Sequence, residues 1–240
     1  MSRTWLESIA KVAKALMPPA LWRTSRAFAT AFVTPIRFSL LTGHWKSSLR
    51  QSACSASGAP IPWYTYPAIN FLAQRAFDDK NVLEFGGGQS TRWWAARAKS
   101  VLTIEENEAW CESLRDTAAP NVTLRYIPVD HATRSIEDVR RVLAAFGIRR
   151  FDIIVIDGHL RRELVKLAFE VLAPRGAILL DNAEGYGFFE EIRDRDCGRV
   201  DFFGFAPGVS KRHCTSLVFV DGCFLLDAKT PIPAIEDIMG

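Results

Sequence analysis

Two patterns of hydrophobic and polar positions alternate along the chain from residue 81 onward. Short apolar runs, typical of buried strands, are followed by longer segments in which apolar residues recur at helical spacing. The runs predict strands at residues 81–85, 100–105, 122–128, 151–157, 176–181, 200–205 and 215–220. The segments between them predict helices at residues 90–98, 107–116, 135–146 and 161–173. Such alternation favours an α/β fold with a doubly wound, mainly parallel seven-stranded sheet.

The last two predicted strands are connected differently from the others. Only residues 206–214 separate them, and this connection is too short for a crossover helix. These two strands should therefore form an antiparallel hairpin, with the last strand running antiparallel in the sheet.

Helical patterns also precede this domain. An amphipathic helix is predicted near the N-terminus from apolar residues at helical spacing, namely Trp5, Ile9, Val12 and Leu16. A second helical segment, residues 21–33, is expected to end at Pro35. Residues 47–62 are rich in Ser, Ala, Gly and Pro, which is typical of a linker. We therefore predict a helical extension with its linker at residues 1–57 and a second domain at residues 58–240.

Composition and charge narrow the class of protein. Of the 240 residues 48% are hydrophobic and 24% are charged, which is typical of a folded globular chain. The five cysteines are scattered and form no CxxC pair, so a reduced, cytoplasmic compartment is expected, without a disulfide framework or a zinc site. No apolar run reaches the roughly 18 residues that a membrane span requires.

Positive charge is concentrated in the extension. Residues 1–50 contain eight Lys and Arg residues and one acid, Glu7, although the net charge of the chain is only +3. A basic amphipathic extension suits three roles: packing on its own domain, pairing in a homo-oligomer, or peripheral contact with the inner, anionic face of a membrane. Nucleic acid is not expected as a partner, because no ladder of aromatic residues or known nucleic-acid motif accompanies the charge.

A glycine-rich turn follows the first predicted strand, in the sequence NVLEFGGGQSTRWW. Such a strand–turn–helix unit lets a ligand approach the backbone closely. A dinucleotide fingerprint would place glycine at position 91, where Thr91 stands, and Glu84 would repel a pyrophosphate. S-adenosylmethionine has no phosphate and carries an ammonium and a sulfonium, so the acid at position 84 suits it.

Over residues 63–220 the sequence resembles the class I S-adenosylmethionine-dependent methyltransferases, whose first motif matches EFGGG. The resemblance implies a Rossmann-like methyltransferase fold and binding of this cofactor. Gly86 and Gly88 would let the cofactor approach, and Glu84 would help to hold its amino end. Glu105 closes the next strand and would accept both ribose hydroxyls, and Asp130 would lie beside the adenine.

Further polar residues follow two later strands. Asp157 and His159 follow one strand, and Asp181 and Asn182 follow the next. Carboxylate and amide oxygens are ligands for Mg²⁺ or Ca²⁺, and this arrangement resembles the metal-dependent O-methyltransferases. The resemblance implies that Asp157, Asp181 and Asn182 hold a metal that activates a substrate hydroxyl. The alternative is that Asp157 caps a helix and that Asp181 and Asn182 open a turn.

The sequence leaves the identity of the general base undecided. Leu160 stands where those metal-dependent enzymes have a lysine, so His159 and Arg161 are the substitutes, and His159 has a suitable pKa. Other residues suit either an acceptor pocket or ordinary packing and solvation, namely Trp63, Tyr64, Tyr66, Lys211, Arg212 and His213.

The expected function is methylation of a hydroxyl oxygen, on a small molecule or a glycan, with Mg²⁺ assistance as one option. Two alternatives remain. One is a noncatalytic module that binds S-adenosylmethionine and docks on a membrane or a partner. The other is an NAD-linked oxidoreductase, which Thr91 and Glu84 disfavour.

Overall fold

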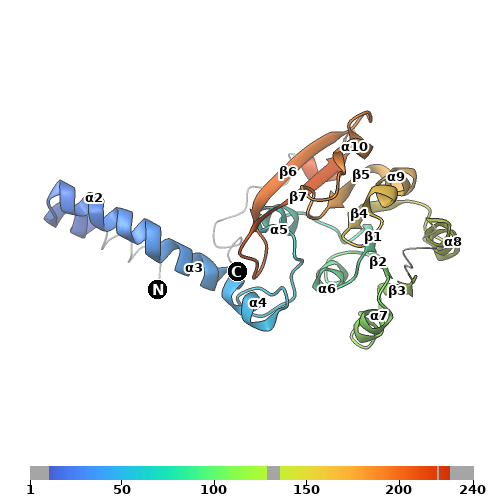
Figure 1. The fold of residues 1–240 in the computed structure, drawn as a ribbon, viewed down its shortest axis with the longest axis horizontal. Helices are drawn as coiled ribbons and strands as arrows, with labels where there is room; N and C mark the ends of the chain where they lie inside the picture. Colours follow the sequence, from blue (N-terminus) through green and yellow to red (C-terminus); the bar gives the residue numbers. More distant parts are fainter. Residues whose placement is uncertain (1–10, 129–135, 221, 228–240) are drawn as a thin grey trace.

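A seven-stranded sheet forms the centre of the computed structural model, which describes residues 11–128, 136–220 and 222–227 (Figure 1). Its strand order is β3-β2-β1-β4-β5-β7-β6. The strands are β1 (Asn81–Phe85), β2 (Ser100–Glu105), β3 (Val122–Tyr126), β4 (Phe151–Ile156), β5 (Leu172–Leu180), β6 (Gly198–Phe205) and β7 (Arg212–Phe219). Strands β1 to β5 pair in parallel, whereas β7 pairs antiparallel with both β5 and β6. The predicted mainly parallel sheet with an antiparallel last strand is confirmed.

Helices cover both faces of this sheet. They are α5 (Tyr66–Ala73), α6 (Gln89–Ala95), α7 (Glu108–Arg115), α8 (Ile136–Phe146), α9 (Arg161–Val171) and α10 (Phe189–Ile192). Because side chains alternate along a strand, Val82 packs with α5 and α6 on one face, whereas Leu83 packs with α8 and α9 on the other. Burial on both faces explains why the central strands appear in the sequence as continuous apolar runs.

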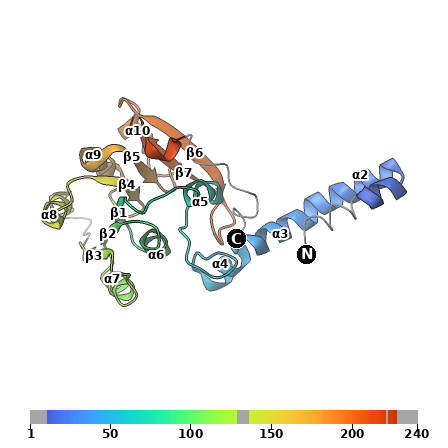
Figure 2. The ribbon, with the colours of Figure 1, turned by 180° about the vertical axis from the view of Figure 1, so that it is seen from behind.

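An arm of helices projects from the domain (Figures 1 and 2). It consists of α2 (Pro19–Phe28), a π-helical segment at Ala29–Val33 and α3 (Thr34–Leu41). The prediction that the helix ends at Pro35 is wrong, because Pro35 lies in the first turn of α3. A proline removes one backbone hydrogen bond and crowds the preceding turn, and the wider π-helical turn just before it accommodates both effects.

The amphipathic helix predicted from Trp5 and Ile9 lies largely outside the described residues. Among the helices that the structure describes, none is long and apolar enough to cross a bilayer.

Helix α4 (His44–Arg50) connects the arm to the domain. The backbone N–H of Gly208 donates a hydrogen bond of 3.2 Å to Nδ1 of His44. Just after α4, Ser52 Oγ accepts a hydrogen bond of 3.0 Å from Nε2 of Gln89. The segment that follows the arm is therefore attached to the domain, at His44 and at Ser52, and Ser52 is bonded to the first turn of α6. The division at residue 57 stays a prediction.

Candidate functional site

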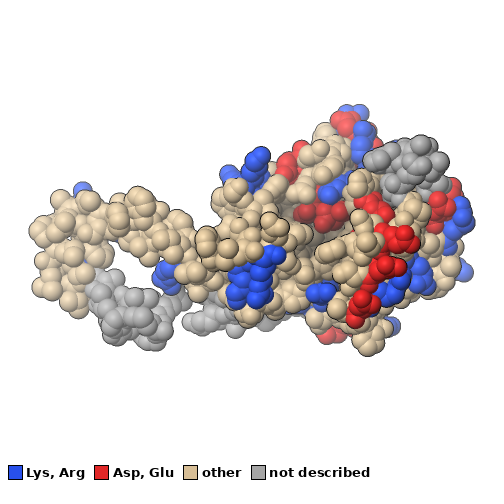
Figure 3. Space-filling model, turned by 60° about the horizontal axis from the view of Figure 1, so that its bottom comes forward, with Lys and Arg blue, Asp and Glu red and all other residues tan. Residues whose placement is uncertain are grey.

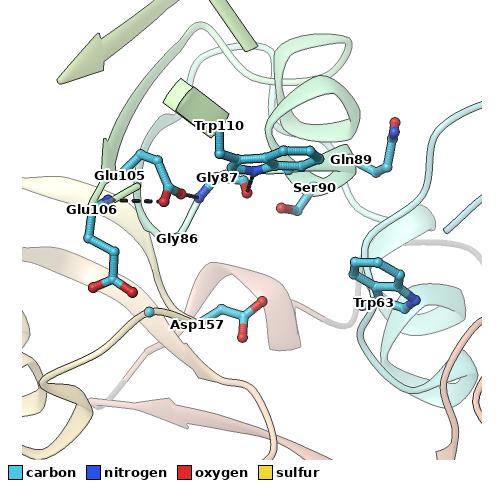
Figure 4. A pocket seen from close by; sticks show the side chains of 11 residues that line it. Trp63, Gly86, Gly87, Gln89, Ser90, Glu105, Glu106, Trp110 and Asp157 are labelled. Carbon is cyan, nitrogen blue, oxygen red and sulfur yellow. Dashed lines mark hydrogen bonds between the residues drawn. The ribbon is translucent and has the colours of Figure 1, made fainter. Parts of the chain in front are cut away.

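The carboxyl ends of β1, β2 and β4 meet around a pocket of about 260 Å³ (Figure 4). On the face shown in Figure 3, acidic side chains gather in and beside a hollow of the domain. The residues that line the pocket are Trp63, Gly86, Gly87, Gly88, Gln89, Ser90, Glu105, Glu106, Trp110, Asp157 and Gly158. The predicted glycine turn, Glu105 and Asp157 are thus brought together at one site, whereas His159, Asp181 and Asn182 are not among the lining residues.

Two glycines of the turn have different roles. Gly86 has a φ of 88°, and a Cβ there would lie 2.6 Å from the carbonyl oxygen of Asp157. Glycine at position 86 is therefore required for the close approach of β1 and β4. Gly88 is extended, with a φ of 175°, and a Cβ there would have Ser90 Oγ, at 3.9 Å, as its nearest neighbour. The space beside Gly88 is therefore open toward the pocket, so a ligand can approach the backbone there. We call this open space the cradle.

Glu84 lies beneath the turn and is fully buried. Its Oε2 accepts hydrogen bonds from the hydroxyls of Thr91, at 2.6 Å, and Thr103, at 2.9 Å. Thr91 Oγ1 also accepts the backbone N–H of Gly88 at 3.0 Å. Burial raises the pKa of Glu84 to about 7, and the hydroxyls of Ser90, Thr91 and Thr103 oppose this rise. Glu84 supports the turn from below and is not among the residues that line the pocket.

Glu105 is held at the pocket wall by backbone groups. Its Oε2 accepts the N–H of Gly87 at 2.7 Å. Its Oε1 accepts the N–H groups of Glu106 and Asn107, at 3.0 and 2.8 Å. These bonds fix the direction of the carboxylate, and its oxygens retain further lone pairs for a ligand hydroxyl. The geometry thus suits the predicted ribose contact, which stays a prediction.

Two tryptophans line the same pocket (Figure 4). The indole Nε1 of Trp110 donates a hydrogen bond of 2.8 Å to the carbonyl of Gly87. The indole of Trp63 donates one of 2.9 Å to the carbonyl of Pro207. Both rings are exposed, and an anchored ring offers a flat apolar face to a planar base or to a cation. The sequence analysis did not identify Trp110, although its place in the helix just after Glu105 was a usable signal.

Arg161 links the ends of β4 and β5. Its Nη2 donates a hydrogen bond of 2.9 Å to Oδ1 of Asp157, and its Nη1 donates one of 2.5 Å to the carbonyl of Asp181. The guanidinium carbon lies 4.0 Å from the centre of the Tyr186 ring. Burial raises the pKa of Asp157 to about 6, and the charge of Arg161 opposes the rise. Burial, followed by the charge of Asp157, raises the pKa of Asp181 well above its usual value.

The three predicted metal ligands do not converge on one point. Oδ1 of Asp157 is paired with Arg161, whereas Oδ1 of Asp181 accepts the hydroxyl of Thr215 at 3.1 Å. The amide nitrogen of Asn182 lies 3.2 Å from a ring nitrogen of a histidine on β7. Within the described parts of the chain, no group of three or more His, Cys, Asp or Glu side chains could hold a metal ion. A guanidinium already bonded to Asp157 repels a second cation, so these residues do not fit Mg²⁺.

His159 and His213 contact different glutamates. His159 contacts Glu106 through Nδ1, and its backbone N–H lies 3.4 Å from Oε2 of the same glutamate. It therefore faces the end of β2. On β7, His213 Nδ1 lies 3.0 Å from Oε1 of Glu184, beside the turn after β5. Asp130, predicted beside the adenine, lies outside the described residues.

Comparison with known proteins establishes the fold. No family model matches the chain, and no curated protein matches it. One similar solved structure is an O-methyltransferase from Bacillus cereus in complex with S-adenosylhomocysteine, with a TM-score of 0.51, 16% identity, and coverage of 89% of this chain and 97% of that one. Another is the O-methyltransferase TomG from Streptomyces achromogenes, involved in tomaymycin synthesis, in complex with S-adenosylmethionine. Its TM-score is 0.52, its identity is 18%, and 92% of this chain and 100% of that one are covered.

Proposed function

We propose that this chain, which has the fold of class I S-adenosylmethionine-dependent methyltransferases, transfers a methyl group to a hydroxyl oxygen. The acceptor is proposed to be a small molecule or a glycan. The observation that carries the proposal is the pairing of an open cradle at Gly88 with an oriented carboxylate at Glu105, both facing one pocket.

The residues around this pocket fit the parts of the cofactor. Glu105 would accept the ribose hydroxyls, because backbone N–H groups already direct its carboxylate along the pocket wall. The space at Gly88 would admit the chain that bears the sulfonium, and the exposed ring of Trp110 would cover a flat or cationic group. When bound, the cofactor supplies a methyl group on a positively charged sulfur.

On the acceptor side, Asp157 is the proposed general base. Its carboxylate lines the pocket, and its raised pKa of about 6 is closer to neutrality than that of an ordinary aspartate. The acceptor hydroxyl would give its proton to Asp157 as its oxygen takes the methyl group, and the sulfur would keep the electron pair of the broken carbon–sulfur bond and leave as a neutral thioether. Arg161 is a positioning residue that holds this carboxylate. His159 faces Glu106 instead, so it ranks behind Asp157 for this role.

The proposal includes no divalent ion. Mg²⁺ was predicted as an activator of the acceptor hydroxyl, but Arg161 already supplies a fixed positive charge between the ends of β4 and β5. The proposed reaction therefore has no step that needs a metal.

The decisive experiment is calorimetric titration of the purified chain with S-adenosylhomocysteine, with NAD as the comparison ligand. One-site binding that Glu105→Ala weakens, and that Glu112→Ala on the exposed side of α7 leaves unchanged, would support the proposed cofactor site. Binding of NAD alone would favour the oxidoreductase. Retained cofactor binding without methyl transfer to a panel of hydroxyl acceptors would favour the noncatalytic module.

A further inference from the structure

The arm exposes large apolar side chains along its length. Leu21 is 52% exposed, Phe28 is 62% exposed and Phe32 is 58% exposed. Phe28 and Phe32 lie side by side, with ring centres 4.7 Å apart. Four further apolar residues on and after α3 are exposed as well, namely Ile36, Leu40, Trp45 and Leu49. Large apolar side chains exposed in this number along one segment mark a site of interaction.

All the charged side chains of this region, counting Lys, Arg, Asp and Glu, are basic. Between Glu7 and Asp78 the sequence contains no acidic residue, whereas eight Lys and Arg residues fall in the same interval. In Figure 3 the described part of the arm is tan with scattered blue and carries no red. The arm therefore attracts anionic surfaces and has no carboxylate with which to neutralise another basic arm.

The two kinds of side chain are separated around the first part of the arm. Leu21 and Phe28 are seven residues apart, so they lie on the same side of the helix, and Phe32 continues that side. Arg23 and Arg26 are three residues apart and fall on the opposite side. A helix of this design can bury its apolar side at the level of lipid acyl chains while its basic side chains extend to the phosphates.

We propose that the arm, residues 19–41, docks on the surface of an anionic lipid bilayer. Its aromatic and aliphatic side chains enter the interface, and Arg23, Arg26 and Arg37 contact lipid phosphates. Charge complementarity favours an anionic bilayer over the arm of a second copy of the chain. Two paired arms would bring like charges together with no carboxylate between them. The inference does not rest on the proposed methyl transfer.

The test uses the full chain and sedimentation with vesicles of phosphatidylcholine, with or without phosphatidylglycerol. The protein is expected to sediment with the anionic vesicles and to be released by added salt, because salt screens the arginine–phosphate attraction. Replacing both phenylalanines, Phe28→Ser with Phe32→Ser, should weaken partitioning by about tenfold or more. Reversing two charges, Arg23→Glu with Arg26→Glu, should abolish the preference for anionic lipid.

Matched controls lie on the domain. Phe203→Ser removes an equally exposed aromatic ring from β6, and Arg149→Glu reverses an exposed charge before β4. Both should leave vesicle binding unchanged. All variants should retain the wild-type melting temperature, which separates loss of docking from loss of folding.

Three results would overturn the proposal. One is absence of binding to anionic vesicles, and a second is equal binding to neutral and anionic vesicles. The third is a dimer in light scattering that the Phe28→Ser, Phe32→Ser variant dissociates while vesicles bind neither protein. This last result would assign the arm to a second copy of the chain.

Discussion

Arg161 and Asp157, four residues apart, form an ion pair of 2.9 Å across the turn between β4 and α9. The pair holds a carboxylate toward the pocket, while a second donor of the same guanidinium binds the end of β5. One side chain thus sets the relative position of two strand ends and the charge of the acceptor side.

Replacing Arg161 should affect the reaction more than the cofactor. Arg161→Met removes the cation that opposes the rise in the pKa of Asp157, so the ionised base forms only at higher pH. We expect the pH profile of kcat/KM to move upward by about one unit, because a nearby opposite charge commonly lowers a carboxyl pKa by this amount or more. Arg161→Lys should restore part of the shift. Unchanged affinity for S-adenosylhomocysteine, measured by calorimetry, is the control, and an unmoved profile would contradict the positioning role.

Chelation should have no effect on activity. The fixed guanidinium stands beside the carboxylate that a divalent ion would need. Methyl transfer should proceed at the same rate after treatment with EDTA and dialysis, and added MgCl₂ should not stimulate it. Stimulation by Mg²⁺ that Asp181→Asn abolishes would restore the metal-dependent alternative.

Activity of the wild-type protein should depend on ionised Asp157. Its pKa in the folded protein is raised to about 6, so the active carboxylate form accumulates as the pH increases through 6. We expect kcat/KM to increase across this range and then to level off. Asp157→Asn should lower the rate by two orders of magnitude or more, as is typical for loss of a general base, and should remove the inflection. His159→Gln serves as the comparison, since loss of the same inflection there would transfer the role to the histidine.

Buried Glu84 should make the protein less stable as the pH increases. Its pKa is raised from 4.5 to about 7, so between these values the folded state retains a proton that the unfolded state has released. The free energy of unfolding should decrease across this range by something on the order of 3 kcal/mol and level off above it. Glu84→Gln keeps an acceptor for Thr91 and Thr103 and carries no charge, so urea denaturation should show no such decrease. Glu112→Gln, on the exposed part of α7, should behave as the wild type.

A larger side chain at position 88 should weaken ligand binding without lowering the melting temperature, whereas one at position 86 should lower the melting temperature. Gly88 has an extended backbone that any residue adopts, and a Cβ there meets no atom closer than 3.9 Å. Gly88→Val should therefore keep its melting temperature but bind S-adenosylhomocysteine at least about tenfold more weakly, because the valine side chain would occupy space that the ligand needs and a tenfold loss requires only about 1.4 kcal/mol. By contrast, Gly86→Val should lower the melting temperature, since its Cβ would collide with the backbone of Asp157. Wild-type affinity in Gly88→Val would place the ligand elsewhere.

The strands of the sheet could be predicted from the sequence because each strand corresponds to its own short run of apolar residues. Strands β1 and β2 are buried on both faces and bounded by polar residues, so their ends match the predicted ones. The course of the arm could not be predicted from Pro35 alone. Proline in the interior of a helix ordinarily ends or kinks it, whereas Pro35 lies in the first turn of α3, directly after a π-helical turn.

The site was predictable as a set of residues but not as a set of contacts. That Glu84 and Glu105 follow or close strands is visible in the sequence, whereas their neighbours are not. Glu84 points into the interior toward Thr103, nineteen residues away, and His159 meets Glu106 from a different strand. These partners depend on the parallel pairing of β1 with β2 and β4, and no local pattern encodes it.

The hydrogen bond between Ser52 and Gln89 has a consequence for how a surface-bound protein would meet its acceptor. Gln89 lines the pocket, so the segment that follows the arm and α4 is bonded directly to the pocket rim. A chain held by this arm on a bilayer would sample acceptors in two dimensions, within the layer to which it is attached. For an acceptor carried in the same bilayer, the rate would then follow the mole fraction of acceptor among the lipids, and dilution of that surface with inert lipid would slow methyl transfer even at constant bulk concentration.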